Sequence, residues 1–292
     1  MSTLSTFLAN NQGSGRLKLR SLSNRLFSSI CIGLAFLTLI PLLSILYLVL
    51  KNGLPLLTPS IFTHLPPAPG LTGGGFGNAV LGTFIMVGIA LLLAAPIGIL
   101  SAIYINEYAR QSYLSNTVRF VARLLTGIPS IICGVFAFAI LVVHTGFSAW
   151  AGGVALAVLI LPTVLLTSEQ ALLAVPQSLR EASTGLGATH LQTIWRVVLP
   201  EALPSMMTGL MLAIARAAGE TAPVLFTALF SQYWLTSLNQ PTASLSVLIY
   251  NFSTLPYDYQ INLAWTASLV LVAIVTLTNV TAQMLFRKRH QL

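Results

Sequence analysis

The chain has 292 residues, of which 55% are hydrophobic and only 7% are charged. Soluble globular domains carry about 25% charged residues, so this composition excludes an ordinary soluble domain and indicates an integral membrane protein. The formal net charge of +8 does not indicate nucleic-acid binding, because the basic residues flank apolar segments instead of gathering on one face. Cys31 and Cys133 both lie within apolar segments, so we expect two small hydrophobic side chains and no disulfide framework.

The chain begins with a polar stretch, residues 1–25, that is basic and contains no acid. Its basic residues are Arg16, Lys18, Arg20 and Arg25. The apolar run 26–50 that follows is too long for the hydrophobic region of a signal peptide, and no Ala-x-Ala cleavage site comes after it. We therefore expect a cytoplasmic tail at 1–25 and a retained first transmembrane helix at 26–50.

Further apolar segments are long enough to cross a membrane. They are 78–105, 124–143, 150–166, 205–230 and 263–286. Lys and Arg gather at both chain ends and in the loops 106–123 and 167–203, whereas the opposite loops hold only Lys51. By the positive-inside rule, both termini and loop 167–203 face the cytoplasm. The sequence predicts an all-α membrane protein with six transmembrane helices and cytoplasmic termini.

The loop after the fourth span contains two patterns that are typical of helix starts. Residues 178–181 (Ser-Leu-Arg-Glu) and 189–192 (Thr-His-Leu-Gln) both have the form of a capping box. Gly185 and Gly187 lie between them, where glycine can adopt the left-handed conformation that ends a helix. The pattern predicts two short helices joined by a glycine elbow, the second of which is interrupted at Pro200.

Five residues of this loop are spaced as in the EAA loop of ABC-transporter permease subunits, which the chain resembles. They are Glu181, Ala182, Gly187, Leu199 and Pro200. Ser183 and Val197 stand where the family has Ala and Ile, and both are small changes of shape. In this family the first short helix of the loop docks into a groove on a separate ATPase subunit. The resemblance therefore implies that these five residues couple the chain to an ATPase.

The fifth apolar segment contains two charged residues, Arg216 and Glu220. A charge at the centre of a bilayer costs about 2.5–3.5 kcal/mol, and residues four apart share one helix face, so we expect these two to pair. Pro223 cannot donate to the Gly219 carbonyl, which predicts a break in the helix beside Glu220. An ion pair that only specifies packing is the plain alternative. Ionisable residues within a membrane more often mark a substrate pathway, which we expect Arg216, Glu220 and Thr221 to line.

The sequence of the fifth apolar segment identifies a branch of the family more specifically than the loop does. Residues 215–228, Ala-Arg-Ala-Ala-Gly-Glu-Thr-Ala-Pro-Val-Leu-Phe-Thr-Ala, are similar to the phosphate-import branch of the permease family. Three shorter motifs also match this branch: Asn-Glu-Tyr at 106–108, Thr-Gly-Ile-Pro-Ser at 126–130 and Leu-Asn-Gln-Pro at 238–241. The resemblance implies a type I ABC importer permease fold over residues 76–290, with the coupling loop at 168–203.

The resemblance also implies a function and a set of partners. The chain would be a permease subunit of an ATP-driven phosphate importer in the bacterial inner membrane. Its partners would be a second permease of similar fold, two ATPase subunits on the cytoplasmic side and an external phosphate-binding protein. ATP-Mg would be bound by the ATPase, so we expect no cofactor, metal or catalytic residue in this chain and no nucleic-acid partner.

Other functions stay open on the residues alone. A permease for another oxyanion, such as phosphonate, sulfate or molybdate, would share the loop and differ in the fifth segment. A stand-alone proton-coupled carrier would use Glu220 as its proton site and need no ATPase. A receptor or structural anchor would leave the two central charges unexplained.

Overall fold

The computed structural model describes residues 2–287, with side chains described for 24–284. Every regular element in that range is a helix, and the chain divides into two units, Met1–Lys51 and Asn52–Leu292. The first unit is occupied by one helix, α1 (Ser2–Gly53). The tail predicted at 1–25 is thus helical from Ser2 onward, and its cytoplasmic location stays a prediction. Large hydrophobic side chains are exposed on all sides of α1 between Leu26 and Leu50, as expected of a helix surrounded by lipid.

Five helices of the described range are long and apolar enough to cross a membrane. Besides α1 they are α2 (Gly77–Ile103, continued by the π-helical turn η2, Tyr104–Tyr108), α6 (Ala149–Leu173), a composite helix and α12 (Asp258–Arg287). The composite helix consists of α8 (His190–Thr193), the π-helical turn η4 (Ile194–Val198) and α9 (Leu199–Gly219).

The third span that the sequence predicts at 124–143 is not a straight helix. α3 (Tyr113–Thr126) is followed by α4 (Ser130–Ala137), η3 (Phe138–Val142) and α5 (Val143–Thr145). The two parts meet at an angle of 103°, so a sixth span exists only if this bent pair is counted as one. The bend lies at Gly127-Ile128-Pro129, because Pro129 restricts the preceding residue to extended conformations. Most of 106–123, predicted as a polar loop, belongs to α3.

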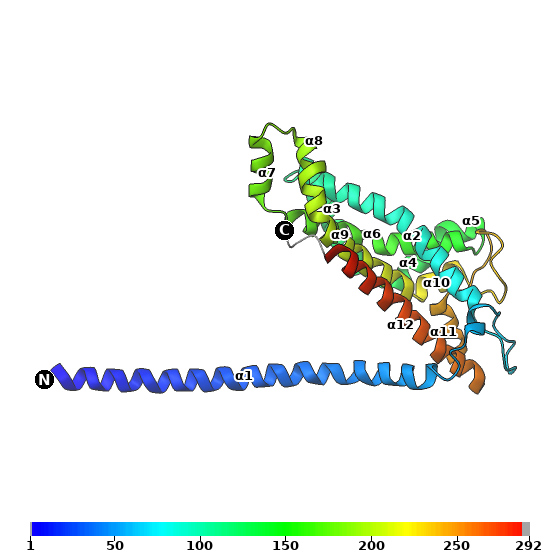
Figure 1. Cartoon of the computed structure of the whole chain (residues 1–292), viewed down its shortest axis with the longest axis horizontal. Helices are drawn as coiled ribbons and strands as arrows, with labels where there is room; N and C mark the ends of the chain where they lie inside the picture. The colour runs from blue at the N-terminus through cyan, green and yellow to red at the C-terminus, as the bar shows by residue number, and fades with distance from the viewer. Residues whose placement is uncertain (1, 288–292) are drawn as a thin grey trace. The chain divides into compact units, whose positions relative to one another are not determined.

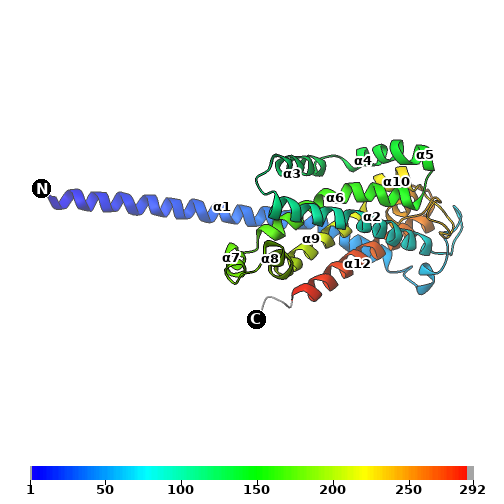
Figure 2. The same ribbon diagram turned by 90° about the horizontal axis from the view of Figure 1, so that it is seen from above.

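Small residues bring α2, α6 and α9 together (Figure 1, Figure 2). A Cβ atom at Gly153 of α6 would lie 2.5 Å from Ile89 of α2, and one at Gly209 of α9 would lie 2.3 Å from Thr167 Oγ1 of α6. Lipid tails are as apolar as leucine, so close packing of this kind is what holds membrane helices together. The shared core is completed by Met86, Ala90, Ala94, Leu156, Ile160, Ala213 and Ala217.

We expect Gly209→Ala to lower the unfolding temperature of the protein in detergent. The added methyl group would overlap Thr167 and force α9 away from α6, and overpacking of this kind costs about 1–3 kcal/mol. Gly88→Ala in α2 is the matched control, because a Cβ atom there meets nothing within 4 Å. Thermal unfolding followed by circular dichroism measures both, and equal unfolding temperatures for the two variants would refute the close contact.

Short helices complete the second unit. α10 (Ala222–Thr227) follows α9, and α11 (Leu245–Ser253) precedes α12. α11 is buried against α12 in a second core with Phe76, Phe252 and Leu263. The 3-10 turn η1 (Pro59–Phe62) belongs to the same end of the unit.

Candidate functional site

The break predicted in the fifth span is present. α9 ends at Gly219, Glu220 has extended backbone angles (φ −74°, ψ 124°), and α10 begins at Ala222 with Pro223 in its first turn. The missing N–H of Pro223 leaves the Gly219 carbonyl without its helical donor, which is why the helix stops here. An interrupted backbone at membrane depth is tolerated where it is buried in protein or lines a cavity.

The two charges of this segment pair as their spacing predicts. Arg216 Nε lies 3.5 Å from Glu220 Oε1, and their side chains are 35% and 18% exposed. Among the described residues, Glu220 is the only ion-pair or hydrogen-bond partner that the Arg216 side chain has, and the closest approach, at Nε, is 3.5 Å. The remaining guanidinium donors are therefore available to an anion. Arg is suited to that role because its planar fork binds two oxygens of one oxyanion.

Neighbouring helices fix the geometry of the break. Ser246 Oγ of α11 donates to the Glu220 carbonyl at 2.9 Å, so one carbonyl that a continuous helix would satisfy is satisfied from another element. α4 also packs against the break, where a Cβ atom at Gly134 would lie 2.8 Å from Pro223 Cα. Cys133 of α4 lies within electrostatic range of both Arg216 and Glu220. The break is thus a fixed feature of the packing.

Thr221 is the third residue that the sequence assigns to the pathway. It lies between the two helices with helical backbone angles (φ −99°, ψ −49°), and its carbonyl accepts from the Leu225 N–H at 2.9 Å. Its side chain is half-buried. The structure places Thr221 next to Glu220, and its contact with a substrate stays a prediction.

The coupling loop contains the two short helices that the sequence predicts. α7 (Gln177–Gly185) is followed by Gly187, whose φ of +85° makes the elbow, and α8 begins after Thr189. The capping box at 189–192 is confirmed: Thr189 Oγ1 accepts from the Gln192 N–H at 3.3 Å, and Gln192 Oε1 accepts from the Thr189 N–H at 2.9 Å. The prediction of a capping box at 178–181 is wrong. The N-cap of α7 is Pro176, two residues before Ser178, and it makes no side-chain cap.

The interruption predicted at Pro200 is also wrong. The chain passes from α8 through η4 into α9 as one helix of 30 residues, His190–Gly219. The π-helical turn widens the helix just before Pro200, which accommodates the missing N–H donor and the bulk of the ring. A single helix therefore connects the coupling loop to Arg216. Leu199 and Arg216 are separated by about 25 Å along it at 1.5 Å per residue.

The coupling residues are accessible. Glu181, Ala182, Gly187 and Pro200 are exposed, and Leu199 is half-buried as the first residue of α9. Leu186, at the end of α7, is 90% exposed. A large apolar side chain on a polar loop is typical of a surface that another protein covers. Docking to an ATPase stays a prediction for these residues.

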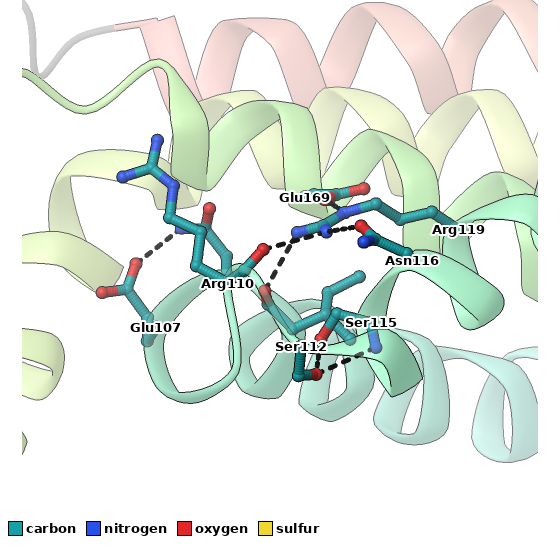
Figure 3. A network of polar contacts seen from close by, with 9 residues as sticks. Glu107, Arg110, Ser112, Ser115, Asn116, Arg119 and Glu169 are labelled. Carbon is teal, nitrogen blue, oxygen red and sulfur yellow. Dashed lines mark hydrogen bonds and ion pairs between the residues drawn. The ribbon is translucent and has the colours of Figure 1, made fainter.

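Sequence reasoning missed two ion pairs between distant segments, and Figure 3 shows the one between Arg119 and Glu169. Arg119 Nε of α3 lies 2.5 Å from Glu169 Oε1 of α6, and Arg180 Nη1 of α7 lies 2.5 Å from Glu107 Oε2 of η2. The partners are 50 and 73 positions apart in the chain, so no local spacing indicates either pair. The only signals are Glu169, an acid three residues after the apolar segment 150–166, and the Asn-Glu-Tyr motif at 106–108.

Solved structures of ABC importers have the same fold. A chain of the bacterial ABC transporter that imports alginate aligns with a TM-score of 0.64 at 18% identity, covering 91% of this chain and 95% of that chain. A chain of the inward-facing MetNI methionine ABC transporter aligns with a TM-score of 0.56 at 24% identity, covering 72% and 92%. The type I ABC importer permease fold that the sequence predicts is therefore confirmed.

Relatives of known name cover most of the chain. The phosphate transport system permease protein PstA of Yersinia pestis is 40% identical over 249 residues, which are 85% of this chain and 84% of that protein. PstA of Haemophilus influenzae is 39% identical over 84% of this chain and 87% of its own length. The probable PstA of Methanocaldococcus jannaschii is 32% identical over 88% and 91%.

A family model agrees with these relatives. The model described as "Binding-protein-dependent transport system inner membrane component" matches residues 94–291. This range includes the bent pair, the coupling loop, the broken helix and α12. The chain therefore belongs to the family of inner-membrane components of binding-protein-dependent transport systems.

Proposed function

We propose that this chain is a permease subunit of an ATP-driven importer of inorganic phosphate in the bacterial inner membrane. The observation that carries the proposal is the Arg216–Glu220 pair at the break between α9 and α10. It supplies a cation for an oxyanion at membrane depth. The relatives named as phosphate transport permeases support phosphate as that oxyanion.

The pair suits phosphate for a chemical reason. An incoming phosphate competes with Glu220 for Arg216 and takes two donors of the guanidinium, whereas Glu220 approaches it no closer than 3.5 Å, at Nε. At neutral pH phosphate keeps at least one proton, which it can donate to the released Glu220 carboxylate or to the Gly219 carbonyl. Sulfate has no proton to donate, so the same carboxylate repels it. Glu220 thus selects against unprotonated oxyanions while Arg216 attracts all of them.

The coupling loop connects this site to the energy source. In the proposal, an ATPase subunit holds exposed α7 through Glu181, Ala182 and Gly187, and its closure upon ATP binding moves α7 and α8 together. Because α8, η4 and α9 form one helix, the movement reaches Arg216 as a tilt of that helix and exposes the site alternately to the two sides.

The proposal includes an assembly and an orientation. The complex consists of this chain, a second permease of similar fold, two ATPase subunits that bind ATP-Mg and an external phosphate-binding protein. Both termini and the coupling loop face the cytoplasm, because Lys and Arg are concentrated there.

Uptake of labelled phosphate into proteoliposomes that contain the whole complex tests the function. We expect uptake that requires ATP and the binding protein and that a tenfold excess of sulfate, molybdate or phosphonate reduces by less than about twofold. Stronger inhibition by one of those anions would identify a permease for that anion. Uptake driven by a pH gradient without ATP would identify a proton-coupled carrier.

A further inference from the structure

The coupling helix α7 is attached to α2 as well as to α9. Arg180, in the middle of α7, donates from Nη1 to Glu107 Oε2 at 2.5 Å and from Nη2 to the Leu172 carbonyl of α6 at 2.8 Å. Glu107 belongs to η2, the π-helical end of α2, and its other oxygen accepts from Asn106 Nδ2 at 2.7 Å. The Glu107 side chain is 4% exposed and the Arg180 side chain 16%, so separating them would leave a largely buried carboxylate without its partner. α7 and the end of α2 are therefore expected to move together.

A second contact strengthens this attachment. The ring of Tyr108, also in η2, packs edge-on against His190 of α8 with 5.2 Å between ring centroids. Ser183 of α7 is hydrogen-bonded to Thr193 of α8 at 2.9 Å. The two helices of the coupling loop are thus bonded to each other and both contact η2. π-helical turns are often found at functional sites, and η2 lies where α2 meets the loop.

The opposite end of α2 leads back to the broken helix. Thr83 Oγ1 of α2 accepts from the Leu245 N–H of α11 at 2.9 Å. The next residue of α11, Ser246, donates to the Glu220 carbonyl at 2.9 Å. α2 therefore connects the coupling helix α7, through α11, to Glu220 at the break. α9 connects the coupling loop to Arg216.

We infer that Glu107 and Arg180 are positioning residues that transmit the movement of α7 through α2 and α11 to Glu220. With α9 carrying Arg216 and α11 holding the Glu220 carbonyl, movement along the two routes changes the distance between the members of the charge pair. This inference rests on the proposed function, because it assigns a second mechanical route to the same site.

The second ion pair provides a matched comparison. Arg119–Glu169 has the same 2.5 Å separation, and its carboxylate and guanidinium side chains are 3% and 17% exposed, against 4% and 16% for Glu107 and Arg180. Arg119 also donates to the Ile105 carbonyl of η2 at 3.0 Å and to the Arg110 carbonyl at 3.1 Å. These contacts join α3 to α6 and to η2, and none of them includes α7. Loss of either pair removes a similar interaction, but only one of them connects the coupling helix.

The test measures phosphate transported per ATP hydrolysed by the complete transporter in proteoliposomes, together with its unfolding temperature. We expect Glu107→Gln and Glu169→Gln to lower the unfolding temperature by similar amounts. Only Glu107→Gln is expected to lower the transport ratio, by about fivefold or more, which is the usual lower range of coupling between distant sites. An unchanged ratio in Glu107→Gln, or an equal loss in both variants, would overturn the inference.

Double variants separate coupling from folding. Glu107→Gln with Arg180→Gln leaves no unpaired buried charge, so this protein is expected to assemble even if the single variant does not. Its transport ratio should stay low, whereas Arg119→Gln with Glu169→Gln should keep the normal ratio. A stable Glu107/Arg180 double variant with a normal ratio would overturn the inference. Absence of ATP-driven phosphate uptake by the unmodified complex would instead refute the proposed function.

Discussion

Replacement of Arg216 by Gln is expected to reduce ATP-driven phosphate uptake strongly while the complex still assembles. Glutamine keeps much of the side-chain length but removes the positive charge, so the dianion loses its compensating cation at the break in α9. Losing one partner of a charge pair costs about 2 kcal/mol or more, so uptake at low phosphate should fall by about 30-fold or more. Initial rates of labelled phosphate uptake in proteoliposomes measure the loss.

Two further substitutions make this result specific. Arg123→Gln removes an exposed arginine from the end of α3 and should leave uptake within about twofold of the original rate, since surface changes of this kind have small effects. Arg216→Lys keeps the positive charge but lacks the planar guanidinium that binds two oxygens, so it should give an intermediate rate of phosphate uptake. Normal uptake by Arg216→Gln would mean that the Arg216–Glu220 pair serves only to specify packing.

Replacement of Gly187 by Val is the second change expected to have a large effect. Gly187 makes the elbow between α7 and α8 with φ +85°, a region that a β-branched residue avoids. No atom lies within 4 Å of a Cβ atom placed there, so the effect arises from the backbone and not from a clash. The elbow should reorganise, the ATPase should no longer co-purify with the permease, and uptake should fall by about tenfold or more.

Gly185→Val provides the control for this experiment. Gly185 is the last residue of α7, has no positive φ, and a Cβ atom added to it would likewise meet open space. This variant should retain the ATPase and at least half of the uptake. Equal loss in both variants would show that bulk on the loop surface matters and that the elbow conformation does not.

The features that could be predicted from the sequence depend on neighbours in the chain. The Arg216–Glu220 pair follows from a four-residue spacing, and the break follows from the missing N–H of Pro223. The capping box at 189–192 and the elbow at Gly187 are also local. In each case the residues that decide the structure lie within one or two helical turns of each other.

The features that were missed depend on contacts between distant segments. The continuation of the helix through Pro200 needs η4, and π-helical turns have no simple sequence signal. The start of α7 after Pro176 shows that a Ser-x-x-Glu pattern can lie inside a helix as well as at its beginning. The bend of 103° in the third span was also missed, and there α4 packs against α10 and α6, which are far from it in the chain.

Restoring a positive charge at position 216 tests the role of the guanidinium most directly. Arg216→Cys is made in a protein in which Cys31 and Cys133 are replaced by Ala, because Cys133 lies next to the charge pair and is half-exposed. The reconstituted complex is treated with a thiol reagent that attaches an ethylammonium group or with its neutral hydroxyethyl counterpart. We expect no phosphate uptake before treatment, partial recovery with the ammonium reagent and none with the neutral one. Recovery with both reagents, or full uptake by untreated Arg216→Cys protein, would contradict a phosphate pathway built on this cation.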